Sequence, residues 1–206
     1  MSRIRNKKQA LILSAACEEF AKQGYAGTKI ADIAAKIELP KANIYYYFKS
    51  KEILYRHVLE SFIQPLLMAT QPFDQYDHPA AALTDFIKLK IEISKNHPNA
   101  SKVFANEILH GAPHLPPDII EKLIQQTCLA SAKLQQWIDK ELMDDIDPLH
   151  LLFMLWASTQ TYADFSWQIK LHLKSDEMQA QDFEVATDTL IKIVLKGCGI
   201  STQMAE

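Results

Sequence analysis

Residues 28–52 read TKIADIAAKIELPKANIYYYFKSKE, and their spacing predicts two short helices joined by a tight turn. Apolar residues recur at helical intervals on both sides of Glu38-Leu39-Pro40, and the second run covers 41–48. Thr28 is suited to cap the first short helix, and Ser50 is suited to cap the helix that follows the second. Because a longer apolar helix precedes them, these elements have the order of a DNA-binding helix-turn-helix.

The second short helix has an inner and an outer face. Ile44 and Phe48 lie one turn apart and are expected to pack inward against the first short helix. Tyrosine hydroxyls on the outer face suit phosphate oxygens, and tyrosine rings suit sugars and thymine methyl groups. The residues expected to point outward are Lys41, Ala42, Asn43, Tyr45 and Tyr46.

Charge is divided unevenly along the chain, although its net value over 206 residues is only -3. Residues 1–56 carry eleven lysines and arginines against five acidic residues, which makes this segment +6 and the remainder -9. A basic head on an acidic body predicts a polyanion-binding module joined to a second activity. Arg3 and Arg5 are expected either to reach a DNA minor groove as an arm or to form a screened tail.

The remainder of the chain also has helical periodicity, and five glycines are too few for a typical sheet protein. We expect an all-α protein with a three-helix DNA-binding domain over 1–50 and a helical ligand-binding and dimerisation domain over 51–206. The helix that begins at Lys51 is expected to kink at Pro65. Beyond it, helices are expected at 79–96, 99–110, 117–143, 148–172 and 181–197, with a loop at 71–78.

The expected helix 148–172 carries a polar and aromatic face. Trp156, Gln160, Asp164 and Trp167 share that face, where an indole stacks, an amide donates and accepts, and a carboxylate accepts an N–H. This set suits a flat, hydrogen-bonding ligand, although each residue taken alone also fits a satisfied core position.

The same helix is apolar almost all round, so one side is expected to contact a partner subunit. The final helix adds an apolar stripe, and the two helices together predict a four-helix homodimer interface. The stripe consists of Val185, Leu190, Ile191 and Val194.

Two other classes of protein are alternatives to this interpretation. Glu107, His110 and His114 have the spacing of metal ligands in an enzyme, but Gly111 and Pro113 interrupt the helix between the histidines. We therefore expect no catalytic residue, no metal and no cofactor, and leave a metal-dependent helical enzyme as a remote alternative. An architectural DNA-binding protein without an effector is the second alternative.

Nothing in the chain suggests membrane insertion or export. No apolar run reaches a membrane-spanning length, and the basic N-terminus lacks the features of a signal peptide. The three scattered cysteines predict free thiols in a reducing compartment. We expect a cytoplasmic protein.

The N-terminal pattern resembles the TetR family of transcriptional regulators over residues 8–55. The resemblance implies that Lys41, Ala42, Asn43 and Tyr45 face DNA bases, that Thr28, Tyr46, Tyr47 and Lys51 face phosphates, and that Lys29 does either. Two positions depart from the family pattern. Glu38 stands where the turn usually has glycine, and Pro40 stands where a serine or threonine usually caps the recognition helix.

The body resembles the YcdC-like (RutR) branch of this family, on runs such as 106–113 (NEILHGAP) and 156–165 (WASTQTYADF). This resemblance implies a repressor of pyrimidine-utilisation genes that responds to uracil or thymine, with Trp156 and Gln160 in its pocket. Asp164 is added because it shares their face. A homodimer on a palindromic operator is expected, and a different small hydrophobic or heterocyclic effector remains the alternative.

Overall fold

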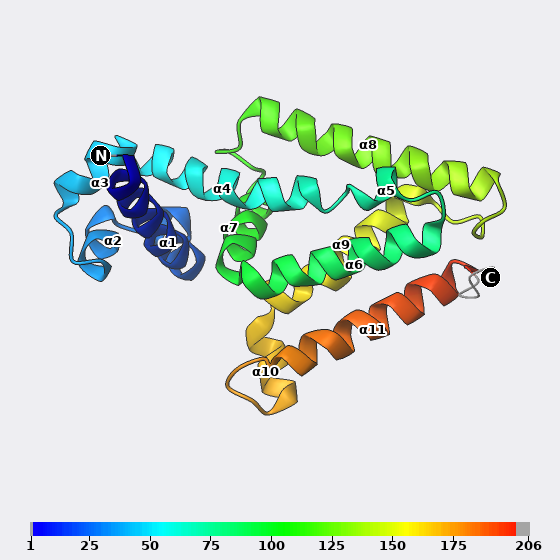
Figure 1. Ribbon diagram of the computed structural model, residues 1–206. Helices are drawn as coiled ribbons and strands as arrows, with labels where there is room; N and C mark the ends of the chain where they lie inside the picture. The colour runs from blue at the N-terminus through cyan, green and yellow to red at the C-terminus, as the bar shows by residue number, and fades with distance from the viewer. Residues whose placement is uncertain (1, 201–206) are drawn as a thin grey trace. The chain divides into compact units, whose positions relative to one another are not determined.

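The computed structural model describes residues 2–200, with side chains from residue 5 onward, and all regular structure in that range is helical (Figure 1). The all-α prediction is therefore confirmed. Within the described residues, no helix is both long and apolar enough to cross a membrane. The helices are α1 (Ser2–Gly27), α2 (Ile30–Lys36), α3 (Lys41–Phe48), α4 (Lys51–Met68), α5 (Pro72–Gln75), α6 (Pro79–Asn96), α7 (Pro98–Leu109), α8 (Pro117–Asp139), α9 (Pro148–Asp164), α10 (Ser166–Leu173) and α11 (Ala180–Gly197).

The helices form two compact units that do not follow chain order. One unit contains Met1–Gln64 together with Asn99–Pro116, and the other contains Pro65–Pro98 together with Pro117–Glu206. The first unit therefore combines α1, α2, α3 and most of α4 with α7 and the loop after it. The predicted functional boundary at residue 50 differs from this division by packing and stays a prediction about function.

The first unit is organised around α1, which Gly24 interrupts. Its backbone there has φ 68° and ψ 175°, a left-handed conformation that glycine adopts without steric cost.

The prediction that Thr28 caps α2 is wrong, because Lys29 occupies the N-cap position without a side-chain bond. The Thr28 hydroxyl instead donates to the carbonyls of Glu19 and Gly24, which makes it an anchor for the end of α1.

The turn between α2 and α3 contains the two residues that depart from the family pattern, and both have the expected consequence for the backbone. Glu38 has φ 54°, so a non-glycine residue takes the left-handed conformation there. Pro40 occupies the N-cap of α3 and gives no side-chain hydrogen bond. Ile44 and Phe48 are buried as expected, and Ser50 accepts the backbone N–H of Ile53 at 3.1 Å, which caps α4.

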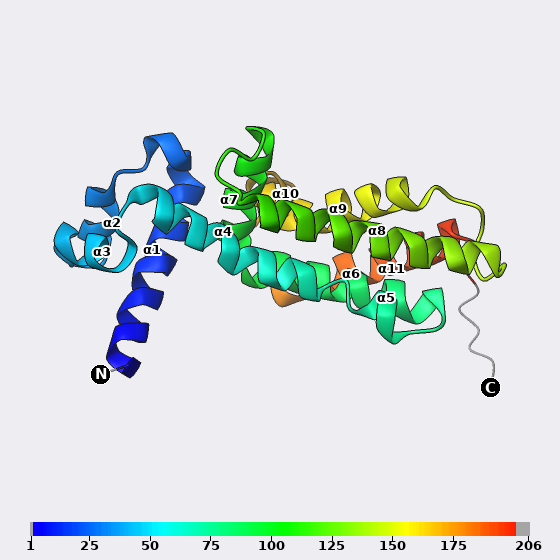
Figure 2. The same ribbon diagram turned by 90° about the horizontal axis from the view of Figure 1, so that it is seen from above.

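The second unit is built around α6, which packs against α9 and α11 (Figures 1 and 2). α8 packs on α9, and the short helix α5 packs on α6 and α8. Apolar side chains from these helices form one continuous core, in which Trp137 is the largest buried side chain. The Trp137 indole N–H donates to the carbonyl of Asp77 at 2.9 Å, so its polar atom is satisfied.

Three expected boundaries differ from the structure. The expected loop 71–78 contains α5, and α8 ends at Asp139 because the chain reverses there and returns Met143 to the core. The expected helix 148–172 is two helices, because Phe165 leaves helical geometry at φ -107° and ψ 26°. No glycine or proline lies at that break, so the sequence did not predict it.

Candidate functional site

The outer face of α3 presents the residues predicted to read DNA. Lys41, Ala42 and Tyr45 are exposed, and Tyr46 is 72% exposed. Asn43 and Tyr47 are half-buried, with the Tyr47 ring edge-on to that of Tyr46 at 5.2 Å between centroids. Lys29, before α2, is also exposed. α3 therefore offers an amide, a lysine and phenol groups on one accessible face.

Thr28, predicted to contact a phosphate, lies inside the first unit. Its side chain is 1% exposed, and its hydroxyl proton is directed to backbone carbonyls of α1. A hydroxyl carries a single donor proton, so a phosphate bond would require it to leave these partners. The predicted DNA contact of Thr28 stays a prediction, and its observed bonds are structural.

Lys51 lies at the first position of α4 and is half-buried. Its ammonium donates to the carbonyl of Ala26 at 3.4 Å and lies 4.6 Å from the centroid of the Tyr25 ring. Burial lowers the pKa of Lys51 from its ordinary value. An ammonium has three N–H donors, so the Ala26 bond leaves donors for a phosphate.

The predicted ligand residues occupy successive turns of α9 in the second unit. Trp156, Gln160 and Asp164 are each half-buried, and Trp156 packs partly against the core. Trp167 does not continue their face, because it follows the break at Phe165 and is 73% exposed on α10. The structure thus retains three of the four residues that the sequence placed on this face.

Lys90, on α6, is a residue that the sequence reasoning did not assign to the site. It is only 4% exposed, and burial lowers its pKa to about 8, while the charge of Asp164 acts in the opposite direction. One turn along α6, the Ser94 hydroxyl donates to the carbonyl of Thr159 on α9 at 2.8 Å. The sequence did indicate that Lys90 is buried, because it lies seven residues, or two helical turns, after Leu83 on the apolar face of α6.

α11 has two faces rather than a single apolar stripe. Val194 is buried, and Leu190 and Ile191 pack partly against the core of the second unit. Val185 and Ile193, two turns apart, are more than half exposed. Leu149 and Phe153 on α9 are exposed as well.

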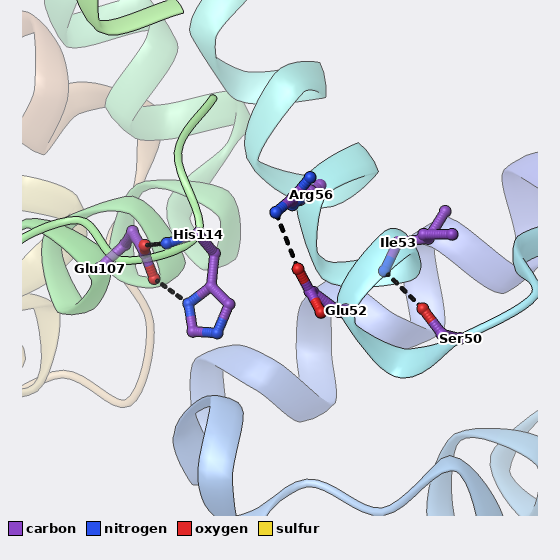
Figure 3. A network of polar contacts seen from close by, with 6 residues as sticks. All are labelled: Ser50, Glu52, Ile53, Arg56, Glu107 and His114. Carbon is purple, nitrogen blue, oxygen red and sulfur yellow. Dashed lines mark hydrogen bonds and ion pairs between the residues drawn. The ribbon is translucent and has the colours of Figure 1, made fainter. Parts of the chain in front are cut away.

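Two of the three residues considered as metal ligands, Glu107 and His114, contact each other, whereas the Nδ1 of His110 lies 2.8 Å from the carbonyl oxygen of Asn106. Glu107 on α7 accepts the backbone N–H of His114 at 2.5 Å and contacts its Nδ1 at 3.1 Å (Figure 3). The loop turns back after α7 through left-handed Gly111 and Ala112, which brings His114 to Glu107 although the helix has ended. Among the described residues, no group of three or more histidine, cysteine or acidic side chains is arranged to hold a metal ion.

Two sequence families cover most of the chain. Residues 12–58 match the family described as bacterial regulatory proteins, tetR family, and residues 59–201 match the YcdC-like protein, C-terminal region. The HTH-type transcriptional regulator RutR of Escherichia coli strain K12 is 36% identical over 196 residues, which cover 95% of this chain and 92% of that protein. The HTH-type transcriptional repressor NicS of Pseudomonas putida is 33% identical over about half of each chain.

Solved structures share the fold at lower sequence identity. The ketosteroid transcriptional regulator KstR2 of Mycobacterium tuberculosis aligns with a TM-score of 0.74 and 21% identity, over 92% of this chain and 94% of that one. AibR, in complex with isovaleryl coenzyme A and operator DNA, aligns with a TM-score of 0.70 and 17% identity, over 90% and 96%. At these identities the likeness concerns the fold alone.

Proposed function

The chain belongs to the TetR family of bacterial regulatory proteins, and from this premise we propose that it is a homodimeric repressor of pyrimidine-utilisation genes. It is a ligand-responsive, DNA-binding transcriptional regulator, and we assign a pyrimidine base such as uracil or thymine as its effector. The observation that carries the proposal is the 36% identity to RutR, which runs through both the DNA-binding segment and the body. A regulator acts where the DNA is, so we place the protein in the cytoplasm.

DNA binding rests on the size and chemistry of α3. Its eight residues span about 12 Å, which matches the width of a major groove. Lys41 and Asn43 are suited to base edges, and the tyrosines are suited to sugars and phosphates. A dimer then predicts a palindromic operator with half-sites one helical turn apart or a multiple of it.

Homodimerisation is supported by the charges on the exposed side of α11. Glu184 and Asp188 lie in its first half, and Lys192 and Lys196 lie in its second half, all of them exposed. An antiparallel pairing of two α11 helices about a two-fold axis sets the acidic half of each against the basic half of the other. The same register brings Val185 of one copy toward Ile193 of its partner, which buries both.

The proposed effector matches the groups around α9. Uracil and thymine are flat rings that carry both N–H donors and carbonyl acceptors. The Trp156 indole offers a stacking surface, and the Gln160 amide both donates and accepts. Asp164 adds a carboxylate acceptor one turn beyond Gln160, and its charge acts on the buried ammonium of Lys90 on α6. A different small heterocycle with the same hydrogen-bonding pattern is the alternative effector.

A binding assay tests this function directly. The duplex from upstream of the protein's own gene is labelled, and fluorescence anisotropy is measured with uracil, thymine, cytosine and, as a control, adenine. We expect tight binding that uracil or thymine reverses and adenine does not. Failure to bind would contradict the DNA-binding assignment. Binding that no pyrimidine reverses up to millimolar concentration would contradict the effector assignment alone.

A further inference from the structure

Glu107 is an almost completely buried carboxylate in the same compact unit as the helix-turn-helix. Its side chain is 3% exposed although it comes from α7, some sixty residues beyond α3 in the sequence. It accepts the backbone N–H of His114 and contacts the imidazole of that residue (Figure 3). Tyr55 of α4 also hydrogen-bonds to it, so one carboxylate joins α7, its following loop and α4.

Three rings connect this carboxylate to the end of α1. The Tyr25 ring lies 4.1 Å from that of His114 and 4.9 Å from that of Tyr55, and His114 and Tyr55 lie 5.2 Å apart, all between centroids. Burial raises the pKa of Tyr55, and the charge and hydrogen bond of Glu107 raise it further. Tyr55 therefore keeps its proton and remains a hydrogen-bond donor to Glu107.

Tyr25 in turn contacts Lys51, the predicted phosphate ligand at the N-terminus of α4. The Lys51 ammonium lies over the Tyr25 ring and donates to the carbonyl of the adjacent Ala26. A cation over an aromatic face is held by the negative face of the ring. The contacts therefore form a continuous path from Glu107 through His114 and Tyr55 to Tyr25, and from Tyr25 to Lys51.

We propose that Glu107 is a positioning residue for DNA binding, which holds Tyr25 in place and so directs the Lys51 ammonium toward the DNA backbone. The proposal rests on the proposed DNA-binding function. It means that the DNA-contacting surface depends on α7 and its loop as well as on the N-terminal helices. A segment of the body then sets the affinity for DNA without touching it.

The test measures how the affinity for the labelled upstream duplex depends on salt, between about 50 and 200 mM. Each phosphate contact adds about 0.9 to the slope of log K against log salt. Lys51→Ala is expected to lower the slope by about that amount. Glu107→Ala is expected to lower the slope equally, and to have no further effect when Lys51 is already alanine. Glu107→Gln retains a hydrogen-bond acceptor for Tyr55 and is expected to restore most of the slope.

Asp85→Ala is the matched control, because Asp85 accepts a hydrogen bond from Tyr76 in the other compact unit. It removes a tyrosine–carboxylate bond and is expected to leave the slope unchanged. If Glu107→Ala does not fold, Tyr25→Leu and Tyr25→Phe decide the question. The leucine variant loses the ring beneath Lys51 and should lower the slope, whereas the phenylalanine variant should not.

Two results would overturn the proposal while leaving DNA binding intact. One is a slope that Lys51→Ala, or a folded Glu107→Ala variant, does not change. The other is a double variant, with Lys51→Ala combined with Glu107→Ala or with Tyr25→Leu, whose slope is lowered by the sum of the two single effects. A wild-type protein that does not bind the duplex contradicts the proposed function itself, so the two failures are distinguishable.

Discussion

At the scale of single residues, one substitution can distinguish the structural role of the Thr28 hydroxyl from its predicted contact with DNA. Thr28→Val keeps the shape of the side chain but leaves the carbonyls of Glu19 and Gly24 without their hydroxyl partner. We expect the free energy of unfolding to fall by about 1 kcal/mol. If the role is structural, the salt dependence of DNA binding stays as in the wild type. A reduced slope, measured by anisotropy, would show that the hydroxyl contacts a phosphate.

Lys90 predicts a pH dependence of stability. Burial lowers its pKa in the folded protein from 10.5 to about 8. Between these two values the unfolded chain holds a proton that the folded chain has lost, so stability rises with pH across this window. Each pKa unit corresponds to about 1.4 kcal/mol, which makes the total rise on the order of 3 kcal/mol. Urea unfolding at pH 7 and pH 10 measures it.

Lys90→Met and Lys88→Met isolate that contribution. Lys88 lies on the same helix, is exposed and pairs with Asp85, so its replacement should leave the rise with pH unchanged. Lys90→Met should remove most of the rise, because Lys90 is the amine whose pKa burial lowers most. An equal rise in all three proteins would assign it to another group whose pKa is lowered in the folded protein, such as Lys51.

At the scale of elements, α11 has one face that packs on its own subunit and an exposed face that we propose for dimerisation. Leu190, part of the stripe predicted from sequence, packs partly on the core of its own subunit, so its replacement would disturb folding as well as assembly. Ile193 offers a cleaner test because it is 59% exposed. Helical periodicity placed Leu190 in the predicted stripe and left Ile193 out of it. The packing of α6 against α11 turns Leu190 inward, whereas Ile193 is exposed.

Ile193→Glu is expected to convert the homodimer to monomer at micromolar concentration. A glutamate there would face the partner's Val185 in the proposed antiparallel register and would lose its hydration without a paired charge. Ile124→Glu on α8 is the matched control, because Ile124 is equally exposed at 59%. Analytical ultracentrifugation distinguishes the two variants. If Ile193→Glu remains dimeric, the proposed interface is wrong.

At the scale of the whole molecule, the proposed response links effector binding to DNA release. An effector changes DNA affinity only through its different affinities for the DNA-binding and released conformations. A hundredfold loss of DNA affinity therefore requires about 2.7 kcal/mol of coupling.

Gln160→Ala is expected to weaken effector binding while DNA binding by the free protein stays at the wild-type level. Removal of the amide leaves the edge of the base without its hydrogen-bond partners, which weakens the binding free energy by about 1–3 kcal/mol. Trp156→Phe is expected to weaken binding less, because part of the stacking surface remains. Isothermal titration calorimetry with uracil measures both. An unchanged uracil affinity in Gln160→Ala would place the ligand elsewhere.

The sequence by itself determined the features that depend on near neighbours in the chain. The helix-turn-helix, the capping of α4 by Ser50 and the outward face of α3 follow from periodicity and turn chemistry, which act over a few residues. The family membership also followed from such local patterns, because they combine caps, core positions and contact positions within one short segment.

Only the tertiary structure decided the features that join distant parts of the chain. Lys90 meets the charge of Asp164 across two helices, and His114 meets Glu107 because a loop turns back on itself. The end of α9 at Phe165 likewise could not be predicted from the sequence, because no glycine or proline lies there. Helical periodicity states which face of one helix is apolar. It does not state which other helix covers that face, and burial, altered pKa values and long-range hydrogen bonds depend on that second helix.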